Sequence, residues 1–123
     1  MNVKSVRIRV YPRNLEKMFD FYENILGLKI QSSWQEDHSI GKIYDLGHSG
    51  SIEVVKFLKT EKKYNPENGA NISLEVENIE SLWEGLKDKA AVLSPLKNYP
   101  WKESSFSIID PEGLEIGFYK KII

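Results

Sequence analysis

The chain contains no cysteine and only two histidines among its 123 residues, so few side chains that bind metals or act as nucleophiles are available. The absence of cysteine excludes disulfides, thiolate metal sites and cysteine nucleophiles. No apolar run approaches the roughly 20 residues that cross a bilayer, and residues 1–5 lack the apolar core of a signal peptide. We therefore expect no membrane partner and a cytoplasmic location.

A strong charge of either sign is also missing. The net charge is -1, and lysine and arginine are mixed with aspartate and glutamate along the chain. Such a sequence presents no overall field that would attract a polyanion, so we expect no nucleic-acid partner. A composition of 41% hydrophobic and 28% charged residues is ordinary for a globular protein, and the length suits one domain over residues 1–123.

A strand followed by an amphipathic helix occurs twice. In the first copy, apolar and polar residues alternate over residues 6–11, and Asn14 can cap a helix that Gly27 ends. In the second copy, the alternation covers residues 72–76 and Asn78 can cap the helix. Asn78 lies 64 residues after Asn14, and the same offset aligns the apolar residues of the two helices and of the two final strands. An internal repeat is a strong constraint on the fold.

Three further apolar stretches follow the first helix, at residues 28–30, 43–46 and 52–57, with a turn at 47–50. Each half therefore reads as βαβββ. We predict an α+β fold of two such modules, about residues 1–58 and 70–123, joined by a polar connection at 59–69. A helix should cover one face of each sheet, which leaves the other face free to curve around a cleft.

Several segments carry a resemblance to a known family: Asn14–Lys17 leading into Phe21–Leu28, then Asn71–Val76, then Asp110–Ile116. They resemble the vicinal oxygen chelate superfamily, which includes glyoxalase I, bleomycin-resistance proteins and extradiol dioxygenases. The resemblance implies a pseudo-two-fold arrangement of the modules in a curved mixed sheet, and a homodimer. It also implies that metal-binding members hold their ion with one side chain from the first and last strand of each half.

The four positions that correspond to those ligands are Arg7, Glu53, Asn71 and Gly117. Arginine has no lone pair to offer a metal and glycine has no side chain, so we expect no metal and no cofactor. Arg7 is instead expected to pair with Glu53, either as a permanent ion pair or as a guanidinium that a ligand anion can recruit. His38 and His48 fall in or beside loops, where we expect exposed polar residues.

The open faces of the sheets should bind the ligand. The predicted ligand-binding residues are Arg7, Arg9, Trp34, Glu53, Asn71, Ser73, Trp101, Glu115 and Tyr119, with Glu75 on the same face. Trp34 follows the second strand and Trp101 sits in a proline-flanked loop, so each could form an aromatic wall or pack in an interface or core rim. The helical register of Trp83 predicts a place in the core.

These residues favour a metal-free protein that binds a small organic molecule. The alternative is an enzyme, either a metal-dependent lyase or dioxygenase of the glyoxalase I type or a metal-free isomerase or lyase. The first form requires ligands that positions 7, 71 and 117 lack, and the second would use Glu53 as base with Glu115 or Glu75 as acid. A structural or regulatory domain that acts through its dimer is a third possibility.

Overall fold

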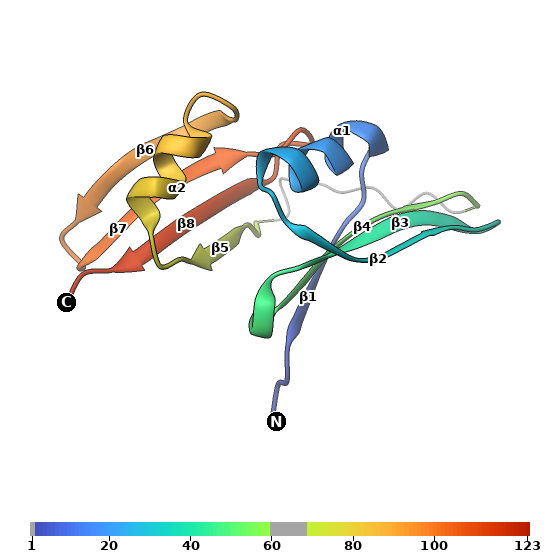
Figure 1. Ribbon diagram of the computed structural model, residues 1–123, viewed down its shortest axis with the longest axis horizontal. Coiled ribbons are helices and arrows are strands. Elements are labelled where there is room, and N and C mark those ends of the chain that lie inside the picture. Colours follow the sequence, from blue (N-terminus) through green and yellow to red (C-terminus); the bar gives the residue numbers. More distant parts are fainter. Residues whose placement is uncertain (1, 60–68) are drawn as a thin grey trace. The chain divides into compact units, whose positions relative to one another are not determined.

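The computed structural model describes residues 2–59 and 69–123, and the chain divides into two compact units (Figure 1). Unit 1 is Met1–Asn65 and unit 2 is Pro66–Ile123. Most of the polar connection predicted at 59–69 lies outside the described residues. That the two units make up a single domain stays a prediction. No described helix has the length and apolar character needed to cross a membrane.

Within its described residues, unit 1 consists of a four-stranded sheet, a helical segment and a short 3-10 turn. The chain runs through β1 (Val6–Val10), α1 (Leu15–Asp20), the π-helical turn η1 (Phe21–Ile25), β2 (Lys29–Gln35), β3 (Ser39–Asp45), the short 3-10 turn η2 (Gly47–Ser49) and β4 (Gly50–Phe57). The strand order is β1-β4-β3-β2, in which β1 is parallel to β4 and the other neighbours are antiparallel.

Unit 2 repeats this arrangement with β5 (Ile72–Glu75), α2 (Ile79–Leu86), β6 (Ala91–Tyr99), β7 (Glu103–Ile109) and β8 (Glu115–Lys121). Its strand order is β5-β8-β7-β6, and β5 is parallel to β8. The register repeats as well, because Ile8 pairs with Ile52 and the residues 64 positions later, Ile72 and Ile116, also pair. The predicted α+β fold of two βαβββ modules is confirmed, with the strands forming two sheets.

Both helices begin at an asparagine cap. The Oδ1 atom of Asn14 accepts a hydrogen bond from the Lys17 amide at 3.1 Å, and Asn78 does the same for Ser81 at 3.3 Å. The first helix differs from its prediction in one respect, since its second half is the π-helical turn η1. Gly27, with φ 68°, then ends the helix as expected.

The helix of each unit packs on one face of its sheet and closes a core there. In unit 1, Met18 and Tyr22 are buried with the inward residues of the sheet, Tyr44, Ile52 and Val54. In unit 2, Ile79 and Leu86 on the helix are buried with Phe106, Ile108, Ile116 and Phe118 on the sheet. Trp83 lies at the edge of this core, half-buried, with its ring 5.1 Å from that of Phe106. Apolar burial of this kind is the main stabilising contribution to each unit.

A polar contact also joins helix and sheet in unit 1. Lys42 Nζ lies 2.5 Å and the Tyr44 hydroxyl 2.9 Å from Glu23 Oε1. Partial burial opposes ionisation of Glu23, but the hydrogen bonds from Lys42 and Tyr44 outweigh it, so the pKa of Glu23 lies below its usual value. Burial, and then the bond to Glu23, raises the pKa of Tyr44. Glu23 is therefore ionised at neutral pH and holds η1 on the sheet.

The edge of the unit 1 sheet differs from its prediction. β2 extends to Gln35, so Trp34 lies within this strand rather than after it, and β3 begins at Ser39 rather than at residue 43. Most of β2 is exposed and its second half is mainly polar, so it lacks the apolar alternation that marks a half-buried strand. The added length brings Trp34 onto the face opposite α1.

Candidate functional site

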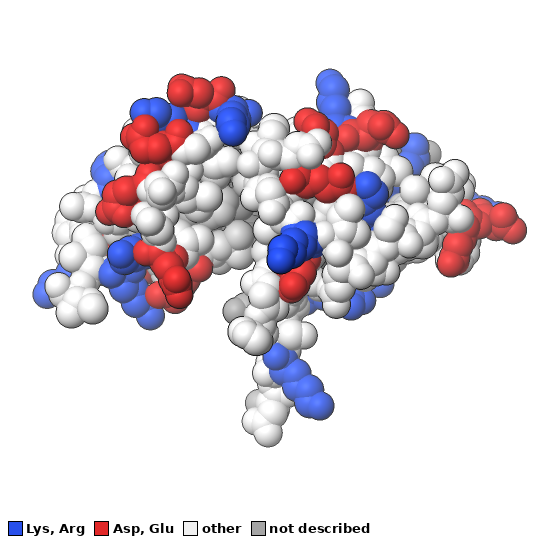
Figure 2. Space-filling view, in the orientation of Figure 1, with Lys and Arg blue, Asp and Glu red and all other residues white. Residues whose placement is uncertain are grey.

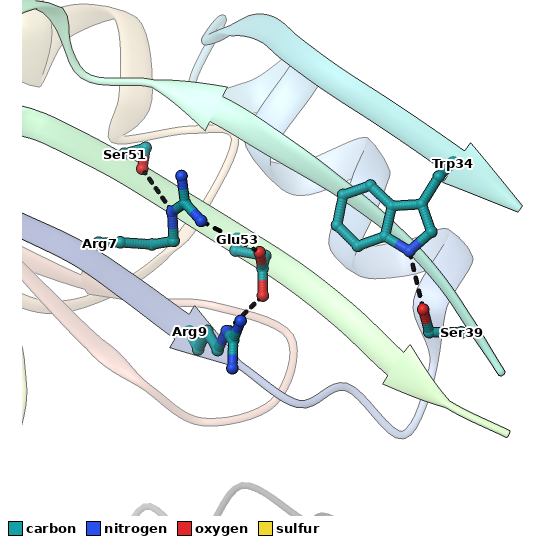
Figure 3. Close-up of polar contacts among 6 residues, drawn as sticks. All are labelled: Arg7, Arg9, Trp34, Ser39, Ser51 and Glu53. Carbon is teal, nitrogen blue, oxygen red and sulfur yellow. Dashed lines mark hydrogen bonds and ion pairs between the residues drawn. The ribbon is translucent and has the colours of Figure 1, made fainter. Parts of the chain in front are cut away.

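Three charged side chains meet on the face of the unit 1 sheet opposite α1 (Figure 3). Arg9 Nε lies 2.5 Å from one carboxylate oxygen of Glu53, and Arg7 Nη1 lies 3.9 Å from the other. Arg7 Nε also donates to Ser51 Oγ at 3.4 Å. Glu53 is buried at 4% exposure, whereas the side chains of Arg7 and Arg9 are about half exposed. The two guanidinium groups therefore surround a buried carboxylate.

The parallel register of β1 and β4 determines which arginine binds Glu53 more closely. Arg9 is the direct neighbour of Glu53, and Arg7 is the neighbour of Ser51. The expected Arg7–Glu53 pair exists only as the long contact, and the short contact is made by Arg9. The prediction placed Arg7 on the correct face of β1, but Arg9, two residues later on the same face, is the residue that lies beside Glu53.

The electrostatics of the cluster favour its charged state. Attraction to Glu53 is the largest cause of the raised pKa of Arg9. A buried carboxylate is stable only when it is paired or hydrogen-bonded, and here the pairing comes mainly from Arg9. Both oxygens of Glu53 face guanidinium groups, so this carboxylate is poorly placed to act as a base.

Trp34 lies across the same face of the sheet. It pairs with Gly41 on β3, and its indole nitrogen donates to Ser39 Oγ at 2.9 Å (Figure 3). A Cβ atom on Gly41 would lie 2.5 Å from the Trp34 ring and 2.8 Å from the backbone oxygen of Val54. Glycine is therefore required at position 41 for the indole to lie flat on the strand.

A pocket of about 300 Å³ opens beside this indole; its lining residues are Arg9, Trp34, Glu36, His38, Ser39, Glu53, Val55 and Phe57. Arg9, Trp34 and Glu53 were predicted to bind the ligand, and the structure brings all three together. Arg7 lies next to the pocket through its contact with Glu53. Phe57 and Val55 provide an apolar wall that sequence reasoning missed, although they follow Glu53 at the two-residue spacing of one strand face.

Unit 2 has a pocket of about 310 Å³ on the corresponding face of its own sheet. Its lining includes all of the predicted unit 2 residues: Asn71, Ser73, Trp101, Glu115 and Tyr119, and also Gly117. Trp101 is 64% exposed in the turn between β6 and β7, and its ring stacks on that of Tyr99 at 4.5 Å. The predicted unit 2 residues thus share one face and one pocket.

Residues of β7 complete this lining and were missed from the sequence. Glu103, Ser105 and Ser107 alternate along the strand and all face the pocket. The offset of 64 aligns β3 with β7, so this face could have been assigned once the register of β3 was known. Glu75 is exposed on β5 and outside the pocket lining.

The residues of these faces do not fit a metal ion. Glu53, the one good ligand at the four corresponding positions, is engaged by Arg9, while positions 7, 71 and 117 offer a guanidinium, a carboxamide and no side chain. Within residues 2–59 and 69–123, no three histidine, aspartate or glutamate side chains gather in a way that could hold a metal. His38 and His48 are exposed as expected, and His38 lies at the rim of the unit 1 pocket.

The sequence and the fold identify the family. A model described as the Glyoxalase/Bleomycin resistance protein/Dioxygenase superfamily matches residues 4–118. The chain belongs to this superfamily, as the resemblance predicted. The sequence matches none of the curated proteins.

Several solved structures share the fold. TioX from Micromonospora sp. ML1 is 15% identical with a TM-score of 0.78, and the alignment covers 96% of this chain and 98% of TioX. TnmS3 from Streptomyces sp. CB03234, described as an antibiotic binding protein, is 22% identical with a TM-score of 0.72 and coverages of 98% and 96%. A glyoxylase/bleomycin resistance protein/dioxygenase domain from Frankia sp. EAN1pec is 18% identical with a TM-score of 0.78 and coverages of 98% and 93%. At such identities the likeness establishes the fold alone.

Proposed function

We propose that the protein binds a small organic molecule, without a metal ion, on the helix-free faces of its sheets. The observation that carries this proposal is the occupation of Glu53 by Arg9 at 2.5 Å, where a metal-binding relative would need a free carboxylate. A guanidinium in this place occupies the carboxylate that would otherwise bind the metal, and it also balances the negative charge of that carboxylate. Metal-dependent catalysis is therefore disfavoured by the donor set.

The two pockets have the features of a binding site for organic ligands. Each has a volume of about 300 Å³, at least one large aromatic side chain and a few polar groups that can orient a ligand. Trp34 is held in place by its bond to Ser39 and by the close approach of Gly41, so its ring is a preorganised surface. The antibiotic-binding activity in the name of TnmS3 is consistent with this class of function.

Two variants with a single tryptophan allow each face to be tested separately. Trp83→Phe/Trp101→Phe leaves Trp34 as the reporter of unit 1, and Trp34→Phe/Trp83→Phe leaves Trp101 as the reporter of unit 2. Both are titrated with flat aromatic compounds of different charge: acridine-9-carboxylate, acridine, 9-aminoacridine and quinacrine. We expect saturable quenching of at least one reporter at micromolar concentrations of at least one compound. Absence of saturable quenching from every compound would contradict the proposal.

The predicted homodimer and the cytoplasmic location stay predictions. Light scattering coupled to size-exclusion chromatography gives the mass in solution, and twice the 14.2 kDa of the chain is the expected value.

The surface charge agrees with a small-molecule ligand rather than a nucleic acid, because acidic and basic side chains are interspersed on the face that Figure 2 shows.

A further inference from the structure

The pocket of unit 2 differs in charge from its counterpart in unit 1. Asn71 and Ser73 occupy the places of Arg7 and Arg9, so the unit 2 face has lost both arginines. Its only charged lining residues, within the described part of the chain, are Glu103 and Glu115. A pocket with two carboxylates and no cation in its lining favours a positively charged ligand.

A row of hydroxyl groups crosses the sheet within this pocket. Ser94 pairs with Ser107, Ser107 with Gly117, and Gly117 with Ser73, so three serines and one glycine form a row across neighbouring strands. A Cβ atom on Gly117 would meet the Ile72 carbonyl oxygen at 3.7 Å and Ser73 Oγ at 3.8 Å, which are ordinary van der Waals contacts, so the glycine leaves room for about one methyl group in the row. The pocket therefore extends down to the hydroxyl groups.

Ser107 provides an independent sign of a ligand. Ser107 is 5% exposed, and its hydroxyl has no hydrogen-bond partner among the described residues. Burying a hydroxyl without a partner costs free energy, and such groups are uncommon in folded proteins. The hydroxyl oxygen exposes less than 1 Å², so a ligand amine would satisfy it as the neighbouring side chains shift to admit it.

The other end of the pocket is aromatic. Tyr99 pairs with Glu103, and Trp101 stacks on Tyr99 with its rings inclined by only 20°. Lys97 Nζ lies 4.8 Å from the centre of the Tyr99 ring, a cation–π contact, and Trp101, which is 64% exposed, offers the free ring surface. Glu103 and Ser107 are four residues apart on β7, about 13 Å along an extended strand.

We propose, resting on the binding function above, that the unit 2 pocket takes an elongated aromatic cation. Its ring system stacks on Trp101 with a basic nitrogen at Glu103. Its tail carries a second amine that reaches the hydroxyl row, where it bonds to Ser107 beside Glu115. The length of the pocket, the charge at its two ends and the unsatisfied hydroxyl are all explained by such a ligand.

Calorimetric titration with quinacrine, 9-aminoacridine and acridine-9-carboxylate tests this assignment. Quinacrine carries an aminoalkyl tail that 9-aminoacridine lacks, and acridine-9-carboxylate reverses the charge. We expect quinacrine to bind at least about ten-fold more tightly than acridine-9-carboxylate, because the pocket is acidic. Glu103→Gln and Trp101→Ala should weaken both amines by about ten-fold.

Variants at the far end separate the tail from the ring. Ser107→Ala and Glu115→Gln should weaken quinacrine by about five-fold and leave 9-aminoacridine within about two-fold. Ser107→Ala should not lower the melting temperature of the free protein, since this hydroxyl bonds no described group. Glu80→Gln, which removes an exposed carboxylate from α2, is the matched control and should change neither affinity.

Equal or tighter binding of acridine-9-carboxylate, no binding of either amine, or amine binding that is indifferent to Glu103→Gln and Trp101→Ala would overturn the inference. In the first of these cases the proposed function would stand, because the protein would still bind an organic ligand. If all the acridines failed to bind, the inference and the proposed function would fail together.

Discussion

The two units share one scaffold but present different chemistry on their helix-free faces. Strand order, strand direction, register and asparagine cap are the same in both. Unit 1 places two arginines around a buried glutamate, whereas unit 2 places serines, two carboxylates and a stacked aromatic pair. The apolar face must match its helix and varies little in character, while the other face is free to vary. Matched substitutions on these faces and at the helix ends therefore test what the two units share and where they differ.

The largest expected contrast is between two glycines. Gly41→Ala should destabilise the protein by about 3 kcal/mol, because the new Cβ would collide with Trp34 and with the backbone of Val54. Gly117→Ala should cost less than about 1 kcal/mol, because space is available there. Urea unfolding of both variants measures the difference. Equal losses would mean that the two faces are packed alike.

The second contrast lies within the ion cluster. Arg9→Ala should cost about 2 kcal/mol, since it leaves Glu53 buried with only the distant Arg7, whereas Arg7→Ala should cost less than about 1 kcal/mol. Urea unfolding gives both values. Lys56→Ala, which removes an exposed cation from the other face of β4, is the control.

Removing the buried charge should suppress the loss at Arg9. In a Glu53→Gln background, Arg9→Ala should cost clearly less than in the wild type. A larger loss for Arg7→Ala than for Arg9→Ala would restore the pairing predicted from the sequence.

A third contrast concerns pH. Glu23 and Lys87 are equivalent positions, but Glu23 bonds to Lys42 and Tyr44, whereas Lys87 bonds to exposed Glu84 at 2.8 Å. Glu23→Gln should cost about 1–2 kcal/mol at pH 7. The folded-state pKa of Glu23 is lowered, so its stabilisation is complete above the unfolded value of about 4.3 and is lost as the pH falls through the folded value.

Thermal unfolding from pH 7 to pH 3 tests this contrast. The difference between wild type and Glu23→Gln should shrink at the acidic end of this range. A difference that grew on acidification would contradict the assigned direction. Glu84→Gln should leave the melting temperature unchanged at neutral pH, because the Lys87 pair is on the surface.

The smallest expected effects test the repeat itself. Asn14→Ala and Asn78→Ala should each cost about 1 kcal/mol, because each removes one cap of the same geometry. Chemical denaturation of the two variants should give losses that agree within experimental error. An effect in only one of them would show that the caps are not equivalent.

The sequence predicted the parts of this molecule that depend on local pattern. Asn14 and Asn78 marked both helix starts, and the offset of 64 aligned the outer strands correctly. The length of β2 was not predictable, because its exposed and mainly polar second half has no apolar face. The partner of Glu53 depends on the register between two strands more than 40 residues apart in the sequence. A local sequence pattern does not determine this register. The unsatisfied hydroxyl of Ser107 emerges only when the packing around it is known.

Metal content of the purified protein tests the central claim most directly. After incubation with zinc, nickel, iron and manganese and removal of unbound ions, mass spectrometry should find far less than one ion per chain. Glu53→Ala should not change that value. One equivalent of a metal per chain, lost on Glu53→Ala, would contradict a binding face in which Arg9 takes the place of the ion.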